Sequence, residues 1–115
     1  MSVRPPRILA PRPIPGALDV LEYEMMQEKA AALGRLTRNF EAALAALADF
    51  DAAEALAPER QRPGRREALL DAAGWALFDF VVQREACGLR NTDAVLKHYN
   101  VPAAVRLRMG TARRP

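Results

Sequence analysis

The sequence predicts an all-α protein, in which a long antiparallel helical hairpin is followed by two short C-terminal helices. Residues 18–57 contain no proline and consist largely of strong helix formers. A turn-forming stretch, PERQRPG, follows at 58–64, and a second helical segment with an apolar centre comes after it. Of the 115 residues, 23 are alanine and only seven are aromatic. Because small side chains bury little area, the core is expected to be thin, and self-association would complete it.

The ends of the chain differ in composition from its body. Residues 1–16 hold five of the nine prolines and three arginines, which predicts a flexible arm that can form neither a helix nor a central strand. Residues 17–110 are expected to form one helical domain, and residues 111–115 a basic tail. Residues 1–16 and 105–115 together carry seven arginines and no acid, so the body between them carries a net charge of −4.

The first helix is expected to run without interruption from residue 18 to about residue 57. In its second half the apolar residues recur at steps of three and four, which indicates one buried stripe: Leu33, Leu36, Phe40, Leu44, Leu47 and Phe50. The first half has its own stripe in Leu18, Leu21 and Met25, widened by Met26. Gly34 lies between the halves and costs roughly 1 kcal/mol relative to alanine, but one continuous helix is still predicted.

The second helix is expected from about residue 65 to residue 87, with Gly88 in the left-handed closing position. Its centre, AAGWALFDFVV at 72–82, is apolar nearly all round. One side carries Leu70, Leu77 and Val81, and another carries Trp75, Phe78 and Val82. A helix with two apolar sides is buried on two sides. Because a two-helix hairpin covers only one of them, this pattern favours a further partner.

Two short helices are predicted after Gly88. Asn91 or Thr92 is expected to cap the first, which ends near Tyr99 and is closed by Asn100. Pro102 suits the first turn of the second, which ends before Gly110.

The lengths of the two long helices predict a partly unpaired first helix. Pairing them about the turn gives three expected contacts: Leu47 with Trp75, Leu44 with Phe78, and Phe40 with Val82. The second helix then ends opposite residues 34–35, and roughly the first sixteen residues of the first helix have no hairpin partner. The short C-terminal helices, another chain, or both would have to cover them.

These features predict a homodimer in which two hairpins form a four-helix core about a closed twofold axis. A different protein partner remains open at this point. The expected core and dimer-interface residues are Leu18, Leu21, Met25, Met26, Trp75, Phe78 and Val82.

The sequence offers little for catalysis, and we expect no enzyme, no cofactor and no metal. A single cysteine, Cys87, and a single histidine, His98, cannot form a Cys/His zinc site, and no recognisable motif of a nucleophile surrounds Cys87. No Glu-x-x-His pair is present for a di-metal bundle, and the glycines are too isolated for a phosphate-binding loop. No signal peptide or membrane-spanning run is apparent, which predicts a cytoplasmic protein that does not contact membranes.

The main alternative is a nucleic-acid-binding protein that uses residues 92–109. This segment has the order short helix, tight turn, short helix of a helix-turn-helix, with Tyr99-Asn100-Val101-Pro102 as the turn. Val105, however, comes one place early for the apolar anchor of the second helix. The contacts to DNA or RNA in this alternative would be Arg106, Arg108, Arg113 and Arg114. We favour a non-enzymatic protein-interaction module over it.

The stretch WALFDFVVQREACGLRNTDAVLKHYNVP, followed by VRLRMG, resembles a family of short, Ala- and Arg-rich helical proteins of unknown function from bacteria, mostly proteobacteria. The similarity extends over about residues 18–110 and is most specific in QREACGLRNTDAV. This resemblance implies a standalone cytoplasmic helical protein, and it brings no activity, cofactor or functional residues with it.

Overall fold

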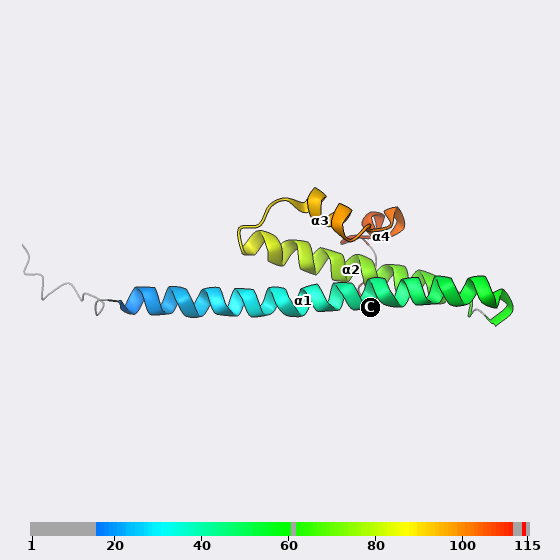
Figure 1. The fold of residues 1–115 in the computed structure, drawn as a ribbon, viewed down its shortest axis with the longest axis horizontal. Coiled ribbons are helices and arrows are strands. Elements are labelled where there is room, and N and C mark those ends of the chain that lie inside the picture. The colour runs from blue at the N-terminus through cyan, green and yellow to red at the C-terminus, as the bar shows by residue number, and fades with distance from the viewer. Residues whose placement is uncertain (1–15, 61, 112–113, 115) are drawn as a thin grey trace, which may run out of the picture.

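A computed structural model describes residues 16–60, 62–111 and 114, and all of its regular elements are helical. Helix α1 covers Ala17–Leu56, and a 3-10 turn, η2, covers Pro58–Arg60. Helix α2 covers Arg65–Ala86 and runs back antiparallel along α1 (Figure 1). The short helices are α3, Thr92–His98, and α4, Ala103–Leu107 (Figure 1). Helix α4 packs on α2, while Tyr99 at the end of α3 contacts both α1 and α2. The predicted all-α fold with a long hairpin and two short C-terminal helices is confirmed.

The helix ends also follow the sequence. Gly88 has φ 82°, and the N–H of Leu89 donates to the carbonyl of Arg84 at 2.9 Å, which closes α2 in the manner expected of a C-terminal glycine. The Asn91 side chain caps α3 by accepting from the N–H of Ala94 at 3.3 Å. Asn100, with φ 50°, closes α3 as predicted. Gly34 does not interrupt α1. The predicted arm falls mainly on residues 1–15, which lie outside the described residues.

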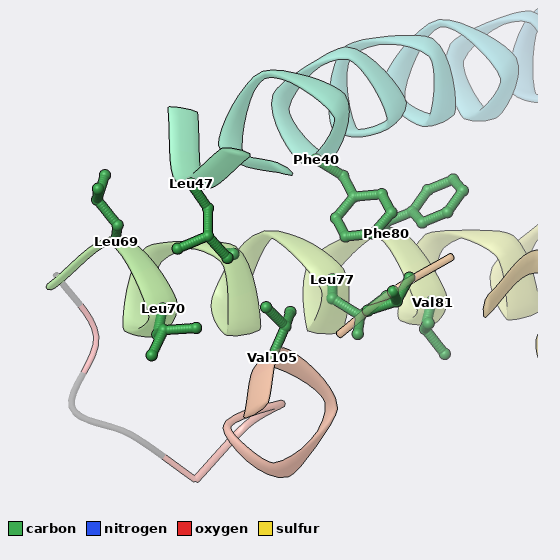
Figure 2. Close-up of a cluster of buried hydrophobic side chains, with 10 residues drawn as sticks. Phe40, Leu47, Leu69, Leu70, Leu77, Phe80, Val81 and Val105 are labelled. Carbon is green, nitrogen blue, oxygen red and sulfur yellow. The ribbon is translucent and has the colours of Figure 1, made fainter. Parts of the chain in front are cut away.

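Helix α2 is the central layer of the fold. Its buried residues face α1 on one side, where they meet Phe40 and Leu47, and α4 on the other, where they meet Val105 (Figure 2). The core is completed by Val101 and by six residues of α2: Leu69, Leu70, Ala73, Leu77, Phe80 and Val81. Contacts within the chain therefore bury Leu70, Leu77 and Val81, whereas we expected α2 to need a further partner. On its other apolar side Trp75 and Phe78 are half-buried and Val82 is exposed. The difference arises because α4 packs on α2, which the local sequence pattern does not show.

The register of the hairpin differs from the prediction. The ring of Phe40 stacks on Phe80, with 5.3 Å between centroids and 17° between planes, and the expected partner Val82 is 47% exposed. Because two residues correspond to more than half a helical turn, this shift turns Val82 away from α1. Trp75 and Phe78, which we expected opposite Leu47 and Leu44, pack edge to face on each other at 5.4 Å. Phe78 also lies beside Gly110, on the side of α2 that faces the C-terminal segment.

Tyr99 joins α3 to the hairpin. Its ring packs edge-on against Phe40 at 5.3 Å and against Phe80 at 6.1 Å, and its hydroxyl donates to Oε2 of Glu41 at 3.4 Å. Burial raises the pKa of the Tyr99 phenol above its ordinary value of 10.0, and the negative charge of Glu41 and the hydrogen bond to it act in the same direction.

This shift predicts that Tyr99 makes the protein less stable at high pH. Above about pH 10 the unfolded chain loses the phenolic proton while the folded chain retains it, so the free energy of unfolding falls as pH rises. In Tyr99→Phe this part of the pH dependence should disappear, whereas Tyr23→Phe, at a 62% exposed position, should leave it unchanged. Urea unfolding between about pH 8 and about pH 11 measures the difference. A wild-type minus Tyr99→Phe difference that does not vary with pH would contradict the prediction.

Candidate interaction surface

The apolar face of α1 that packs against α2 continues beyond the end of α2. Met26, Leu33, Phe40 and Leu47 recur every seven residues and so lie in one row along the helix. Phe40 and Leu47 are buried and Leu33 is half-buried, but Met26 is 68% exposed. Met25 lies about 100° around the helix from Met26 and is 58% exposed. The same apolar pattern is therefore buried in the second half of α1 and uncovered in the first half.

The boundary between the covered and uncovered parts lies at Lys29. The Lys29 carbonyl accepts from Nε2 of Gln83 at 3.3 Å and from Sγ of Cys87 at 3.7 Å, so the C-terminal end of α2 meets α1 here. We predicted this end opposite residues 34–35, so the hairpin is about one helical turn longer than expected. We call residues 17–28, which precede this contact, the overhang; in Figure 1 they form the part of α1 that has no helix beside it.

The overhang combines apolar and acidic side chains. Every residue from 18 to 31 is exposed, including the predicted interface residues Leu18 at 59% and Leu21 at 54%. The overhang contains no base but four acids: Asp19, Glu22, Glu24 and Glu28. Single exposed apolar residues are normal, but a stripe at helical spacing on an otherwise polar helix is typical of an interaction site.

The other predicted interface residues lie on α2. Trp75 and Phe78 are half-buried, and the guanidinium of Arg114 lies over the indole ring of Trp75, 4.0 Å from its centroid. Val82 is exposed and belongs to the outer side of α2. The structure thus places five of the seven predicted residues on the surface and packs Trp75 and Phe78 against the C-terminal segment of the same chain.

The arginines predicted to contact nucleic acid are partly engaged within the chain. Nε of Arg108 lies 3.0 Å from Oδ1 of Asp71, and its Nη2 also pairs with Glu67. Arg114 donates from both terminal nitrogens to the two carboxylate oxygens of Asp79, at 3.1 and 3.2 Å. Arg106 is exposed, and Arg113 lies outside the described residues. Nucleic-acid binding stays a prediction, and the ion pairs give it no added support because they reduce the free positive charge.

A close approach between α2 and the end of α4 was not apparent from the sequence. A Cβ atom added at Gly74 would lie 2.8 Å from both Cβ and the carbonyl oxygen of Arg108, which is closer than real Cβ contacts. Glycine at this position therefore lets the backbone after α4 lie directly on α2. The sequence contains one indication of this contact, because Gly74 is an isolated glycine inside a helix. Glycine costs roughly 1 kcal/mol there relative to alanine, and close packing against another segment explains why it is present.

The two residues considered for catalysis have separate surroundings. The Cys87 thiol contacts the Lys29 carbonyl and the Gln83 amide, while the His98 ring packs edge-on against Tyr99 at 4.9 Å. Within residues 16–60, 62–111 and 114, no three Cys, His, Asp or Glu side chains are grouped so that they could hold a metal ion. Among the described helices, none has the length and apolar character needed to cross a membrane.

The fold and the surface define the class of this protein: a helical hairpin with an uncovered N-terminal overhang and two short helices packed against the hairpin. The chain belongs to DUF6665, a family of unknown function whose model matches residues 7–114. This agrees with the resemblance noted around QREACGLRNTDAV, while the bacterial distribution of the family stays a prediction. Searches of curated proteins and of solved structures each found no match.

Proposed function

We propose that this protein is a non-enzymatic, cytoplasmic interaction module and that the overhang is its contact surface. The observation that carries the proposal is the seven-residue row Met26, Leu33, Phe40 and Leu47, which is buried where α2 covers it and exposed where α2 ends. The uncovered end of this row, together with the exposed Leu18, Leu21 and Met25, offers a second helix an apolar surface like the one that α2 covers.

We propose a second copy of the chain as the partner. Two overhangs can pair antiparallel about a closed twofold axis, with the two hairpins at opposite ends. The centre would then consist of the two paired overhangs, and the C-terminal end of one α2 helix would lie at each end of this paired segment. Each copy contributes four large apolar side chains, and each such side chain gains about 1.5–3 kcal/mol when fully buried. The combined gain from burying these side chains is comparable to the roughly 4–15 kcal/mol that association costs.

The proposal predicts that Met25→Glu abolishes self-association while Val20→Glu does not. The two positions are 58% and 56% exposed and both lie in the overhang, but Val20 shares its row with the exposed Gln27 and Glu41, away from the apolar stripe. Sedimentation equilibrium over a range of concentrations measures the effect. The wild-type chain of 12.7 kDa and Val20→Glu should approach twice the monomer mass, and Met25→Glu should remain at it. A wild-type mass that stays monomeric at every concentration would refute self-association.

The charge of the overhang supplies a second test of the same pairing. Because each overhang carries four acids and no base, two copies repel each other electrostatically. Raising the salt concentration screens this repulsion and should strengthen the dimer. Association that weakens with salt would contradict the pairing of two overhangs and would indicate a basic surface as the partner.

A further inference from the structure

An open surface pocket, called the cavity below, lies between α1, the C-terminal part of α2 and α3, away from the overhang. Its volume is about 540 Å³, within the range of small-molecule sites in proteins. Leu33, Phe80, Val95 and Tyr99 supply apolar walls from the three helices. Among the described residues that line the cavity, none is an aspartate or glutamate, and the charged one is Arg84.

Arg84 differs from Arg66, Arg108 and Arg114 because none of the ion pairs among the described residues includes it. Those three arginines each pair with an aspartate. Its guanidinium carbon lies 5.8 Å from the centroid of the Phe80 ring. Its Nε atom is buried and has no hydrogen-bond acceptor within the described part of the chain. Native proteins leave few buried donors unpaired, so the Nε atom of Arg84 calls for an explanation.

The residues around the cavity leave the positive charge of Arg84 available to a ligand. Glu41, which does not line the cavity, accepts the hydrogen bond of the Tyr99 hydroxyl. The positive charge of Arg84 lowers the pKa of Tyr99, although burial raises this pKa by more. The guanidinium is therefore close enough to interact electrostatically with Tyr99, which lines the cavity. His98 and Asn91 at the cavity add polar groups and no negative charge.

We propose that this cavity binds a small carboxylate with an apolar body. A carboxylate has two oxygens that match two N–H groups of one guanidinium, and it would supply the negative charge that Arg84 lacks among the ion pairs of the described residues. The hydrocarbon part of the ligand lies against Phe80, Val95 and Leu33. A single guanidinium and largely apolar walls suit a monoanion with a hydrocarbon tail and do not suit a dianion such as a free phosphate.

The test compares three probes on the full-length protein: octanoate, which has both parts of the proposed ligand, octanol, which has only the apolar part, and acetate, which has only the carboxylate. Binding is followed by amide chemical shifts, which show where each probe binds. We expect octanoate to shift the signals of Val95 and Tyr99 and to bind about 10- to 100-fold more tightly than octanol, because charge-assisted hydrogen bonds have this strength. Octanoate should also bind more tightly than acetate, because only octanoate has a hydrocarbon chain to bury.

Substitution of Arg84 separates its role from that of the walls. Arg84→Met keeps most of the aliphatic stem and removes the charge, so octanoate should bind no more tightly than octanol to this variant. Arg90→Met, at an exposed arginine that does not line the cavity, should bind octanoate like the wild type. Octanol binding the wild type as tightly as octanoate, octanoate shifting only the signals of the overhang, or Arg84→Met retaining full affinity would each overturn the proposal. If Arg84→Met does not fold, the comparison of probes on the wild type decides alone.

Discussion

Replacing Phe40 by alanine is expected to lower the free energy of unfolding by about 3–5 kcal/mol. The Phe40 side chain has no exposed surface, stacks on Phe80 and meets the edge of Tyr99, so it joins α1, α2 and the end of α3 at one point. Its removal leaves a cavity that helices on three sides cannot close, and it also removes two aromatic contacts, each of which contributes about 0.5–1.5 kcal/mol beyond its buried area.

Urea denaturation followed by far-UV circular dichroism measures this loss. Phe50→Ala is the matched control, because it makes the same chemical change at a half-buried position of the same helix and should cost clearly less. If Phe40→Ala is unfolded without denaturant, Phe40→Leu provides a smaller step that can still be measured. A loss below about 1 kcal/mol for Phe40→Ala would mean that the packing of the hairpin differs from the one described.

Replacing Gly74 by alanine is expected to destabilise the protein, although alanine is the better helix former. The added methyl group would lie 2.8 Å from the Arg108 carbonyl oxygen, and that backbone would have to move. Overpacking of this kind costs about 1–3 kcal/mol, which exceeds the roughly 1 kcal/mol that alanine gains over glycine within a helix. Because Arg108 would move away from Asp71 and Glu67, its ion pairs would weaken as well.

The matched control for Gly74→Ala is Gly34→Ala. A Cβ at Gly34 would meet only the terminal nitrogen of the flexible Arg38 side chain, at 3.4 Å, so the gain in helix propensity should remain and stability should rise by about 0.5–1 kcal/mol. The two variants should therefore change the urea midpoint in opposite directions. Fluorescence of Trp75, which is the single tryptophan of the chain and lies beside the C-terminal segment, should change in Gly74→Ala only. Equal stabilisation of both variants would contradict the close approach of α4 to α2.

The local chemistry of the chain was sufficient to predict its helices but not their packing. Proline-free composition, the glycine at residue 88 and the asparagines at residues 91 and 100 act on their own neighbours, so the sequence predicts their effects directly. The register of the hairpin depends on the turn between the two long helices, which local patterns do not determine. A register two residues from the expected one places Phe80 opposite Phe40 in the position predicted for Val82.

Contacts between distant segments could not be predicted. The ion pair of Arg108 with Asp71 and the fit of Gly74 beneath Arg108 depend on where α4 crosses α2, which no local pattern determines. The sequence predicts that α2 is apolar on two sides, but it does not predict that α4 packs against α2. Helix α4 lies far along the chain from the residues it covers. The cavity beside Arg84 was missed for the same reason: its walls come from three helices.

The overhang also makes local stability uneven along a single unbroken helix. A helical segment of about a dozen residues is only marginally stable in water, and residues 17–28 depend on the packed part of α1 for a preformed helix end on which to grow. The cost of opening their backbone hydrogen bonds therefore decreases from Lys29 towards Ala17, while the same bonds around Phe40 open only with the hairpin itself. Binding of a partner to the overhang must offset the conformational entropy that this segment loses when it becomes ordered. The affinity of the partner therefore depends on how much of the helix is already formed before contact.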